Sequence, residues 1–159
     1  MTTSGSAVVT LPEDTQILIT RVFDAPRHLV WRAYTEPELI ARWWSGERGE
    51  VTSVEVDLRV GGLWRYVMTA NEGFEVAFHG EFREIVAPER IVTTEVYEGA
   101  PGEGALDTAT FSEAGGRTTL TVLMQLDSRE TRDAILATGM EGGMQEAYDR
   151  LERVAIALA

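Results

Sequence analysis

The sequence predicts an α+β protein in which one curved antiparallel sheet of six or seven strands packs against a long C-terminal helix. Segments that alternate apolar and polar residues recur every ~8–12 residues between turn signals, which is typical of antiparallel strands. Residues 129–158 contain no proline, and their apolar side chains recur at steps of three and four, which indicates an amphipathic helix. Because a sheet must bury one face, this apolar stripe is its expected partner.

The elements follow in a simple order. Residues 15–24 are β-branched and alternating, and therefore predict the first strand. A helix is expected over 26–35 with Asp24 as its cap, and a second short helix over 37–44. Six more strands are expected, over 50–58, 63–70, 74–86, 91–98, 105–113 and 117–127. In the final helix, Gly139, Gly142 and Gly143 each cost ~1 kcal/mol relative to alanine, which implies a kink or a close approach.

The length of 159 residues suits one domain, expected over 14–159 after a flexible tail at 1–13. The tail has neither a basic segment nor a long apolar one, so it does not resemble a secretory signal. No stretch approaches the ~18 apolar residues that a membrane span needs. The expected location is therefore the cytoplasm, with no membrane partner.

The charge balance excludes several kinds of chemistry. The chain has 26 acidic residues, 14 arginines, no lysine and no cysteine, for a net charge of -12. Such an acidic chain is a poor partner for nucleic acid. Lysine Schiff bases, thiol nucleophiles and cysteine metal sites are excluded. His28 and His79 have no second histidine at ligand spacing, so neither a metal nor a cofactor is expected.

Strand alternation predicts which side chains face the helix. Large aromatic and methionine side chains dominate that face, and they suit an adaptable apolar pocket. The alternative is that they simply fill the core. The candidate ligand-binding residues are Trp64, Tyr66, Met68, Phe78, Glu95, Tyr97, Phe111, Met124, Met140, Met144 and Tyr148.

Glu95 is the acidic residue that the alternation places inward, between Thr93 and Tyr97. A buried carboxylate is costly unless it is paired, and burial raises its pKa. Glu95 could orient a ligand or act as a general base, with Tyr97 and His79 as weaker catalytic candidates. Alternatively, it pairs with an arginine or a tyrosine, or a bulge turns it outward. His79 is expected on the outer face unless a bulge brings it beside Glu95.

Two further motifs have structural interpretations. Residues 57–62 resemble a phosphate loop, but they precede a strand rather than a helix. A hairpin turn is therefore expected, with Arg59 against Asp57 or another surface acid. Of the adjacent Trp43 and Trp44, one is expected in the core, and the other at a cavity mouth or a partner surface.

Four stretches carry a family pattern in matching order and spacing. They are RVFDAPRHLVWRAYTEPELIARWW (21–44), VEVDLRVGGLWRYVM (54–68), FHGEFREIVAPERIV (78–92) and RDAILATGMEGGMQEAYDRLE (132–152). They resemble the START-like SRPBCC superfamily, and within it the AHSA-type branch named after the activator of the heat-shock-protein-90 ATPase. The resemblance implies a helix-grip fold with a hydrophobic cavity between the sheet and the C-terminal helix. Members of this branch often have a tryptophan where this chain has Met144.

Three functions are consistent with these observations. The first is binding of a small hydrophobic or aromatic molecule in the cavity. The second is a cyclase or dehydratase that uses an acid–base residue in the cavity. The third, which the resemblance suggests, is co-regulation of a chaperone ATPase, although one domain leaves no room for the amino-terminal domain of the eukaryotic co-chaperones. A homodimer through an exposed strand edge or the tryptophan pair is a further expectation.

Overall fold

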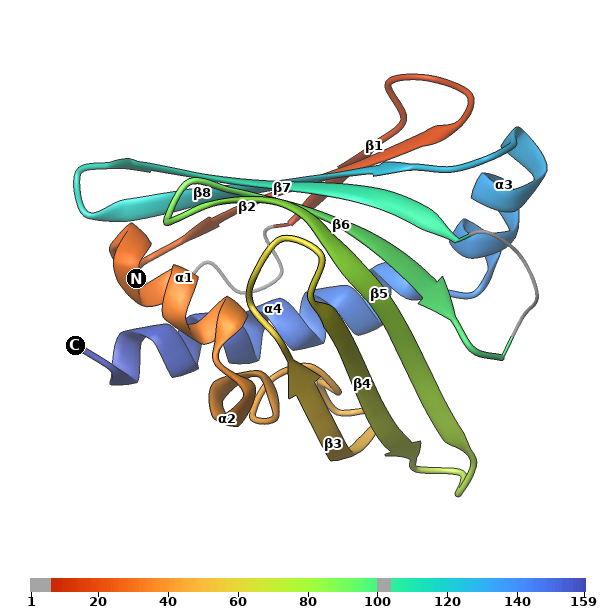
Figure 1. The fold of residues 1–159 in the computed structure, drawn as a ribbon, viewed down its shortest axis with the longest axis horizontal. Coiled ribbons are helices and arrows are strands. Elements are labelled where there is room, and N and C mark those ends of the chain that lie inside the picture. The colour runs from red at the N-terminus through yellow and green to blue at the C-terminus, as the bar shows by residue number, and fades with distance from the viewer. Residues whose placement is uncertain (1–6, 100–103) are drawn as a thin grey trace.

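The computed structural model describes residues 7–99 and 104–159, which form one curved sheet around a C-terminal helix (Figure 1). The strands are β1 Val8–Thr10, β2 Gln16–Phe23, β3 Gly49–Val56, β4 Leu63–Ala70, β5 Glu75–Val86, β6 Arg90–Tyr97, β7 Ala105–Ala114 and β8 Arg117–Gln125. The helices are α1 Arg27–Thr35, α2 Pro37–Ile40, α3 Arg129–Ala137 and α4 Met140–Ala157. The strand order is β1-β2-β8-β7-β6-β5-β4-β3, and all neighbours are antiparallel. The predicted fold class is confirmed, with eight strands instead of six or seven.

The additional strand is β1, which lies inside the segment expected to be a flexible tail. Val8 pairs with Thr20 of β2, and β-branched residues favour such pairing. The backbone of Ala7 also bonds to Gln145 of α4, which donates to the Ala7 carbonyl at 2.8 Å and accepts its N–H at 3.3 Å. The expectation was therefore wrong for residues 8–10, and residues 1–6 lie outside the described part of the chain.

The C-terminal helix is also divided, where the sequence predicted one helix over 129–158. Gly139 adopts a φ of 78°, a left-handed conformation that glycine tolerates and other residues resist. Gly139 lies between the two helices and is the N-cap of α4. Ser128 caps α3 by accepting the Thr131 N–H at 3.1 Å. The break orients α3 independently of α4, which lies along the concave face of the sheet (Figure 1).

Two alanine substitutions in this region are expected to have opposite effects. Gly139→Ala should destabilise the protein by about 1 kcal/mol or more, because alanine is strained at positive φ. Gly143→Ala should stabilise it by about 0.5–1 kcal/mol, because a Cβ at this helical position meets no atom within 4 Å. Urea unfolding of both variants measures the difference. Equal effects would contradict the assignment of Gly139 as the helix break.

The first helix begins differently from the prediction. The N-cap of α1 is Pro26, without a side-chain cap bond, so the expectation for Asp24 was wrong. The backbone N–H of Asp24 instead donates to Glu152 of α4 at 2.9 Å. α1 contacts α4 directly, and α2 follows it toward β3. Both short helices therefore cover the open end of the concave face (Figure 1).

The core lies between the concave face, α1 and α4. Its fully buried members include Ile17 and Phe23 of β2, Val30 of α1, and Leu151 and Ala155 of α4. Burying a leucine or phenylalanine side chain contributes about 1.5–3 kcal/mol. No helix in the described part of the chain has the length and apolarity to cross a membrane.

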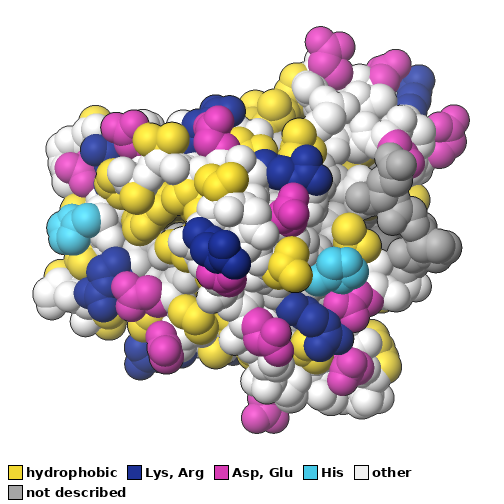
Figure 2. Space-filling model, viewed as in Figure 1, with side chains coloured by type: hydrophobic (Ala, Val, Ile, Leu, Met, Phe, Trp, Pro, Cys, Tyr) yellow, Lys and Arg dark blue, Asp and Glu magenta, His cyan; other side chains and the backbone are white. Residues whose placement is uncertain are grey.

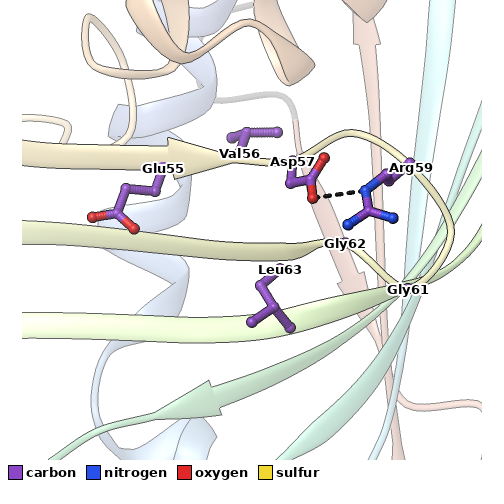
Figure 3. Close-up of a pocket in the computed structure, with 7 residues that line it drawn as sticks. All are labelled: Glu55, Val56, Asp57, Arg59, Gly61, Gly62 and Leu63. Atoms are coloured by element: carbon purple, nitrogen blue, oxygen red, sulfur yellow. Dashed lines mark hydrogen bonds and ion pairs between the residues drawn. The ribbon is translucent and has the colours of Figure 1, made fainter.

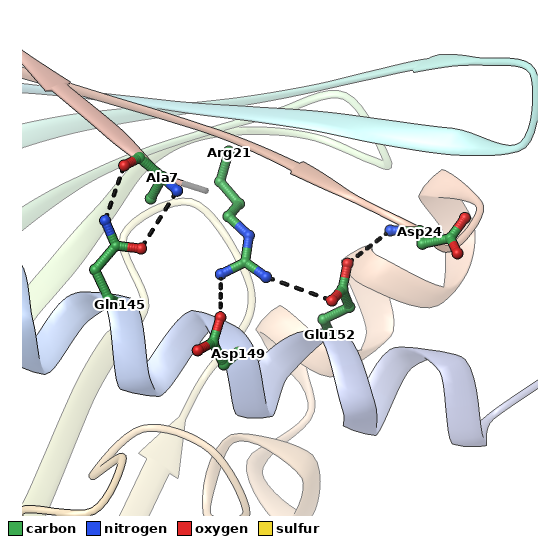
Figure 4. A network of polar contacts seen from close by, with 6 residues as sticks. All are labelled: Ala7, Arg21, Asp24, Gln145, Asp149 and Glu152. Carbon is green, nitrogen blue, oxygen red and sulfur yellow. Dashed lines mark hydrogen bonds and ion pairs between the residues drawn. The ribbon is translucent and has the colours of Figure 1, made fainter. Parts of the chain in front are cut away.

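A buried ion-pair network connects the sheet to α4 (Figure 4). Arg21 of β2 lies 2.7 Å from Asp149 and 3.4 Å from Glu152, and its side chain is 0% exposed. Its guanidinium also lies 5.1 Å from the centre of the Phe23 ring. Glu152 is buried, with 2% of the residue exposed, and Arg21 faces it from the sheet.

Candidate functional site

Two carboxyl groups meet on the concave face of the sheet. Glu95 lies on β6 and Asp107 on β7, where Glu95 pairs with Ala105 and Thr93 pairs with Asp107. The two acids are therefore diagonal neighbours on one face, a spacing that long side chains bridge. Each carboxyl group shifts the pKa of the other. Two interacting carboxylates repel each other, so the pair favours a state in which the two groups share one proton.

The pKa of each carboxyl group in the pair is shifted, and each shift has a physical cause. Burial raises the pKa of Glu95, and the hydrogen bond from Asp107 partly opposes this rise. Burial and the charge of Glu95 raise the pKa of Asp107 well above its ordinary value. Both pKa values are raised, so the pair titrates as a unit that keeps a proton above the ordinary pKa of a carboxyl group.

Three tyrosines surround the pair, and with it they form what we call the acid–tyrosine cluster (Tyr34, Tyr66, Glu95, Asp107 and Tyr148). Burial raises the pKa of each tyrosine, and the charge of Glu95 raises it further. The hydroxyls are thus neutral and able to donate. The five residues come from α1, β4, β6, β7 and α4, so tertiary structure alone brings them together.

The residues beside Glu95 are small. Ala105 is its partner on β7, and the pairs His79–Val96 and Phe82–Thr93 place Gly80 beside it on β5. A Cβ at Gly80 would lie 1.8 Å from the Thr94 carbonyl and 2.7 Å from Trp64 Nε1. Glycine is therefore required here for the close approach of backbone and indole.

Trp64 covers Gly80 from β4. Its side chain is buried, with 7% of the residue exposed, and its indole N–H has no hydrogen-bond partner. One oxygen of Asp107, Oδ1, is also buried without a partner. Buried polar atoms normally find partners, so a donor and an acceptor left unsatisfied in one region are unusual.

An aromatic group extends from the cluster toward β3. The Trp64 and Tyr66 rings lie 4.7 Å apart, and Trp44 contacts Tyr66 and Phe78 at 5.5 and 5.8 Å. Phe78 in turn contacts Tyr97 at 5.1 Å. Trp43 lies in the core, as expected for one of the two adjacent tryptophans, and donates to the Ala33 carbonyl at 2.8 Å.

The other candidate residues differ in how deeply they are buried. Met124 and Tyr148 are buried in the core, whereas Met140 and Met144 are half-buried against it. Phe111 is 1% exposed and its ring contacts Trp31 and Tyr34 at 5.3 and 5.2 Å, so it belongs to the closed core. Met68 is half-buried near the far end of β4, outside the core cluster.

His79 does not join Glu95, so the hypothesis of a Glu95–His79 acid–base couple is wrong. The side chain is 48% exposed, and Nδ1 lies 2.9 Å from Glu98. Arg65 donates to both oxygens of Glu98, and together the two partners lower the pKa of Glu98 to about 2. His28 is exposed on α1. Figure 2 shows acidic and arginine side chains interspersed over one face, on which the two histidines lie apart from each other.

The 57–62 segment forms the predicted turn (Figure 3). Arg59 Nε lies 2.8 Å from Asp57 Oδ2, and the Gly62 N–H donates to the Arg59 carbonyl at 2.8 Å. A shallow hollow of about 440 Å³ adjoins the turn, lined by Glu55, Val56, Asp57, Arg59, Gly61, Gly62 and Leu63. Its arginine is already neutralised, so the hollow does not offer an anion site. Over residues 7–99 and 104–159, no three acidic or histidine side chains gather as metal ligands would.

Asp107 and Tyr34 were not among the candidate residues predicted from the sequence, whereas Trp64 was. Asp107 has the same parity along its strand as the candidate Phe111, so alternation was a usable signal. Tyr34 belonged to the apolar stripe of the first helix, but nothing local indicated which sheet residues it would meet. The expectation of an arginine or tyrosine partner for Glu95 was incomplete, because its direct partner is an acid.

The architecture defines a helix-grip protein, in which a curved antiparallel sheet encloses a C-terminal helix, with polar groups on the concave face. The family model described as "Activator of Hsp90 ATPase homolog 1-like protein" matches residues 24–155. The chain therefore belongs to this family. None of the curated proteins matches the chain.

Solved structures of bacterial proteins share the fold. A protein from Rhodobacter sphaeroides is 27% identical, with a TM-score of 0.87 over 96% of this chain and 99% of that one. A protein from Mycobacterium smegmatis is 26% identical, with a TM-score of 0.83 over 93% and 96%. An AHSA1-like protein from Aeromonas hydrophila, 24% identical over 89% and 93%, has a TM-score of 0.65 and shows the likeness of fold.

Proposed function

We propose that this protein binds a small apolar or aromatic molecule between the concave face of the sheet and α4, with the Glu95–Asp107 pair as its polar anchor. The observation that carries the proposal is this carboxyl pair, placed among aromatic rings and next to Gly80 and Ala105. A protein that needed only a packed core gains nothing from two half-buried acids side by side, because their partial removal from water costs free energy.

Partial exposure supports the same conclusion. Tyr34, Tyr66, Glu95 and Asp107 are only half-buried, yet enough protein surrounds them to raise the pKa of each. Side chains that line an interior space have this combination of properties, because protein encloses them without filling the space. The half-buried Met140 and Met144 would form a flexible wall on the α4 side.

Binding of 1-naphthalenemethanol, a neutral aromatic alcohol, tests the proposal. Isothermal titration should show one saturable site in the wild type and none in Ala105→Leu. The reason is that Ala105 lies next to Glu95, so a leucine there would occupy the ligand space. Ala105 is 7% exposed, and the proposal places the ligand beside it, so the leucine should enter the ligand's space and leave the free energy of unfolding within about 1 kcal/mol of the wild type.

Two alanines on the same strand serve as controls. Ala114→Leu, at the exposed end of β7, should bind the alcohol like the wild type. Ala109→Leu, in the packed core, should lose about 1–3 kcal/mol of stability through overpacking. The proposal fails if the wild type does not bind, if Ala105→Leu binds as well as the wild type, or if Ala105→Leu is destabilised as much as Ala109→Leu.

A further inference from the structure

We propose that the ligand is an organic cation: a small aromatic or apolar amine whose ammonium group lies against Glu95 and Asp107. This inference rests on the proposed function and specifies the chemical class of the ligand. It comes from the charges that face the carboxyl pair, from an unsatisfied acceptor within it, and from the aromatic rings around it.

The carboxyl pair lacks a basic partner among the described residues. Only burial and the other carboxyl group shift the pKa of either acid. The chain contains no lysine, and its two histidines lie on the outer face of the sheet and at an exposed position of α1. The nearby buried arginine, Arg21, is already held by Asp149 and Glu152. An anionic ligand would add to the negative charge, whereas a cation would compensate it.

The second line of evidence is an unsatisfied acceptor. Asp107 Oδ1 is buried without a hydrogen-bond partner, whereas nearly all buried polar atoms in folded proteins are paired. Trp64 Nε1, which lies over Gly80 beside Glu95, is itself a donor that an ammonium group cannot satisfy, so Trp64 supports the inference only through its ring. An ammonium group brings three donors to a place that holds several carboxylate lone pairs.

The aromatic rings favour the same class of ligand. Trp64, Tyr66 and Phe78 line the concave face next to the pair, and the negative faces of such rings attract cations. The net charge of -12 attracts cations at longer range. The interior and the surface therefore select for the same sign of charge.

Binding of a cation should also release protons. An ammonium group between the two carboxyls favours their ionised forms, so the shared proton would leave on binding. Affinity for the amine should therefore rise with pH as long as the amine stays protonated. The titratable and charged groups that face the pair from the packed elements are Tyr34 of α1, Tyr66 of β4, Tyr148 of α4 and, through Tyr148, Arg21 of β2.

Three probes with one ring skeleton test the charge preference: 1-naphthylmethylamine, 1-naphthalenemethanol and 1-naphthoic acid. At pH 7.5 we expect the wild type to bind the amine about tenfold more tightly than the alcohol, and the acid more weakly than both. The Glu95→Gln/Asp107→Asn variant should lose more affinity for the amine than for the alcohol, so that the two affinities differ by at most about threefold.

The control separates the interior pair from the acidic surface. Glu50→Gln/Glu55→Gln removes two exposed carboxylates of β3 and should keep the preference for the amine over the alcohol. The wild type in 0.5 M NaCl should keep it too, because salt screens exposed charges more than buried ones. Equal binding of amine and alcohol by the wild type, or a preference that survives in the interior variant, would overturn the inference and leave the binding function intact. Absence of binding for all three probes would overturn the proposed function itself.

Discussion

Replacing Arg21 with methionine is expected to lower the free energy of unfolding by about 3–5 kcal/mol. The substitution removes the guanidinium that now lies 3.4 Å from Glu152 and 2.7 Å from Asp149, and it leaves the Glu152 side chain, which is 3% exposed, without it. An uncompensated buried carboxylate is far costlier than the loss of a surface ion pair. Urea unfolding at pH 7 measures the effect.

The matched control is Arg117→Met, which removes an arginine that is 46% exposed and 3.7 Å from Asp24. We expect a change of at most about 0.5 kcal/mol there. The triple variant Arg21→Met/Asp149→Asn/Glu152→Gln should recover part of the lost stability, since it removes the uncompensated charges and keeps an acceptor for the Asp24 N–H. A single variant as stable as the wild type would contradict this role for the network.

Asp107→Asn is expected to make the protein more stable than the wild type at pH 8, and no more stable at pH 4. The pKa of Asp107 is raised in the folded state, so the folded protein binds more protons than the unfolded chain. Stability then falls as pH rises above the unfolded pKa of about 4 and through the raised folded pKa. Each unit of difference in pKa costs about 1.4 kcal/mol. The amide cannot ionise, so the variant avoids this loss.

Chemical denaturation of the wild type and the variant between pH 4 and pH 8 checks the sign. Glu98 contributes in the opposite direction in both proteins, because its pKa is lowered to about 2. It therefore cancels in the difference between the two curves, which reports the Glu95–Asp107 pair. Glu50→Gln, an exposed acid on β3, should differ little from the wild type at either pH. A difference that grows toward low pH would refute the shared-proton description of the pair.

The sequence predicted much of the fold because local signals were strong. Alternation in β4, β5 and β8 identified both the strands and their inward faces, and the apolar stripe identified α4. Two errors came from weak or ambiguous signals. β1 has only three residues, too few to show a periodicity. Gly139 could either kink a helix or end it, and the outcome depends on a backbone angle that the sequence does not reveal.

The site was predicted in part. Glu95 was expected on the concave face and is there, and its raised pKa follows from burial, as expected for an inward carboxylate. Its partner was not predicted, because the meeting of Glu95 with Asp107 depends on how β6 and β7 are aligned. A shift of one residue would place Asp107 on the outer face.

By itself, the sequence determined the chemistry that is available to this protein: no lysine, no cysteine, a strongly acidic chain, and a concave face rich in aromatic and methionine side chains. Those properties depend on composition and on the two-residue period of a strand. Only the tertiary structure decided which of the 26 acidic residues are buried, and with what. Glu152 meets an arginine, whereas Glu95 meets another acid, because long-range register and helix docking bring together residues far apart in the chain. The same burial raises the cost of each charge, and it makes the Glu95–Asp107 pair the most informative place to test for a ligand.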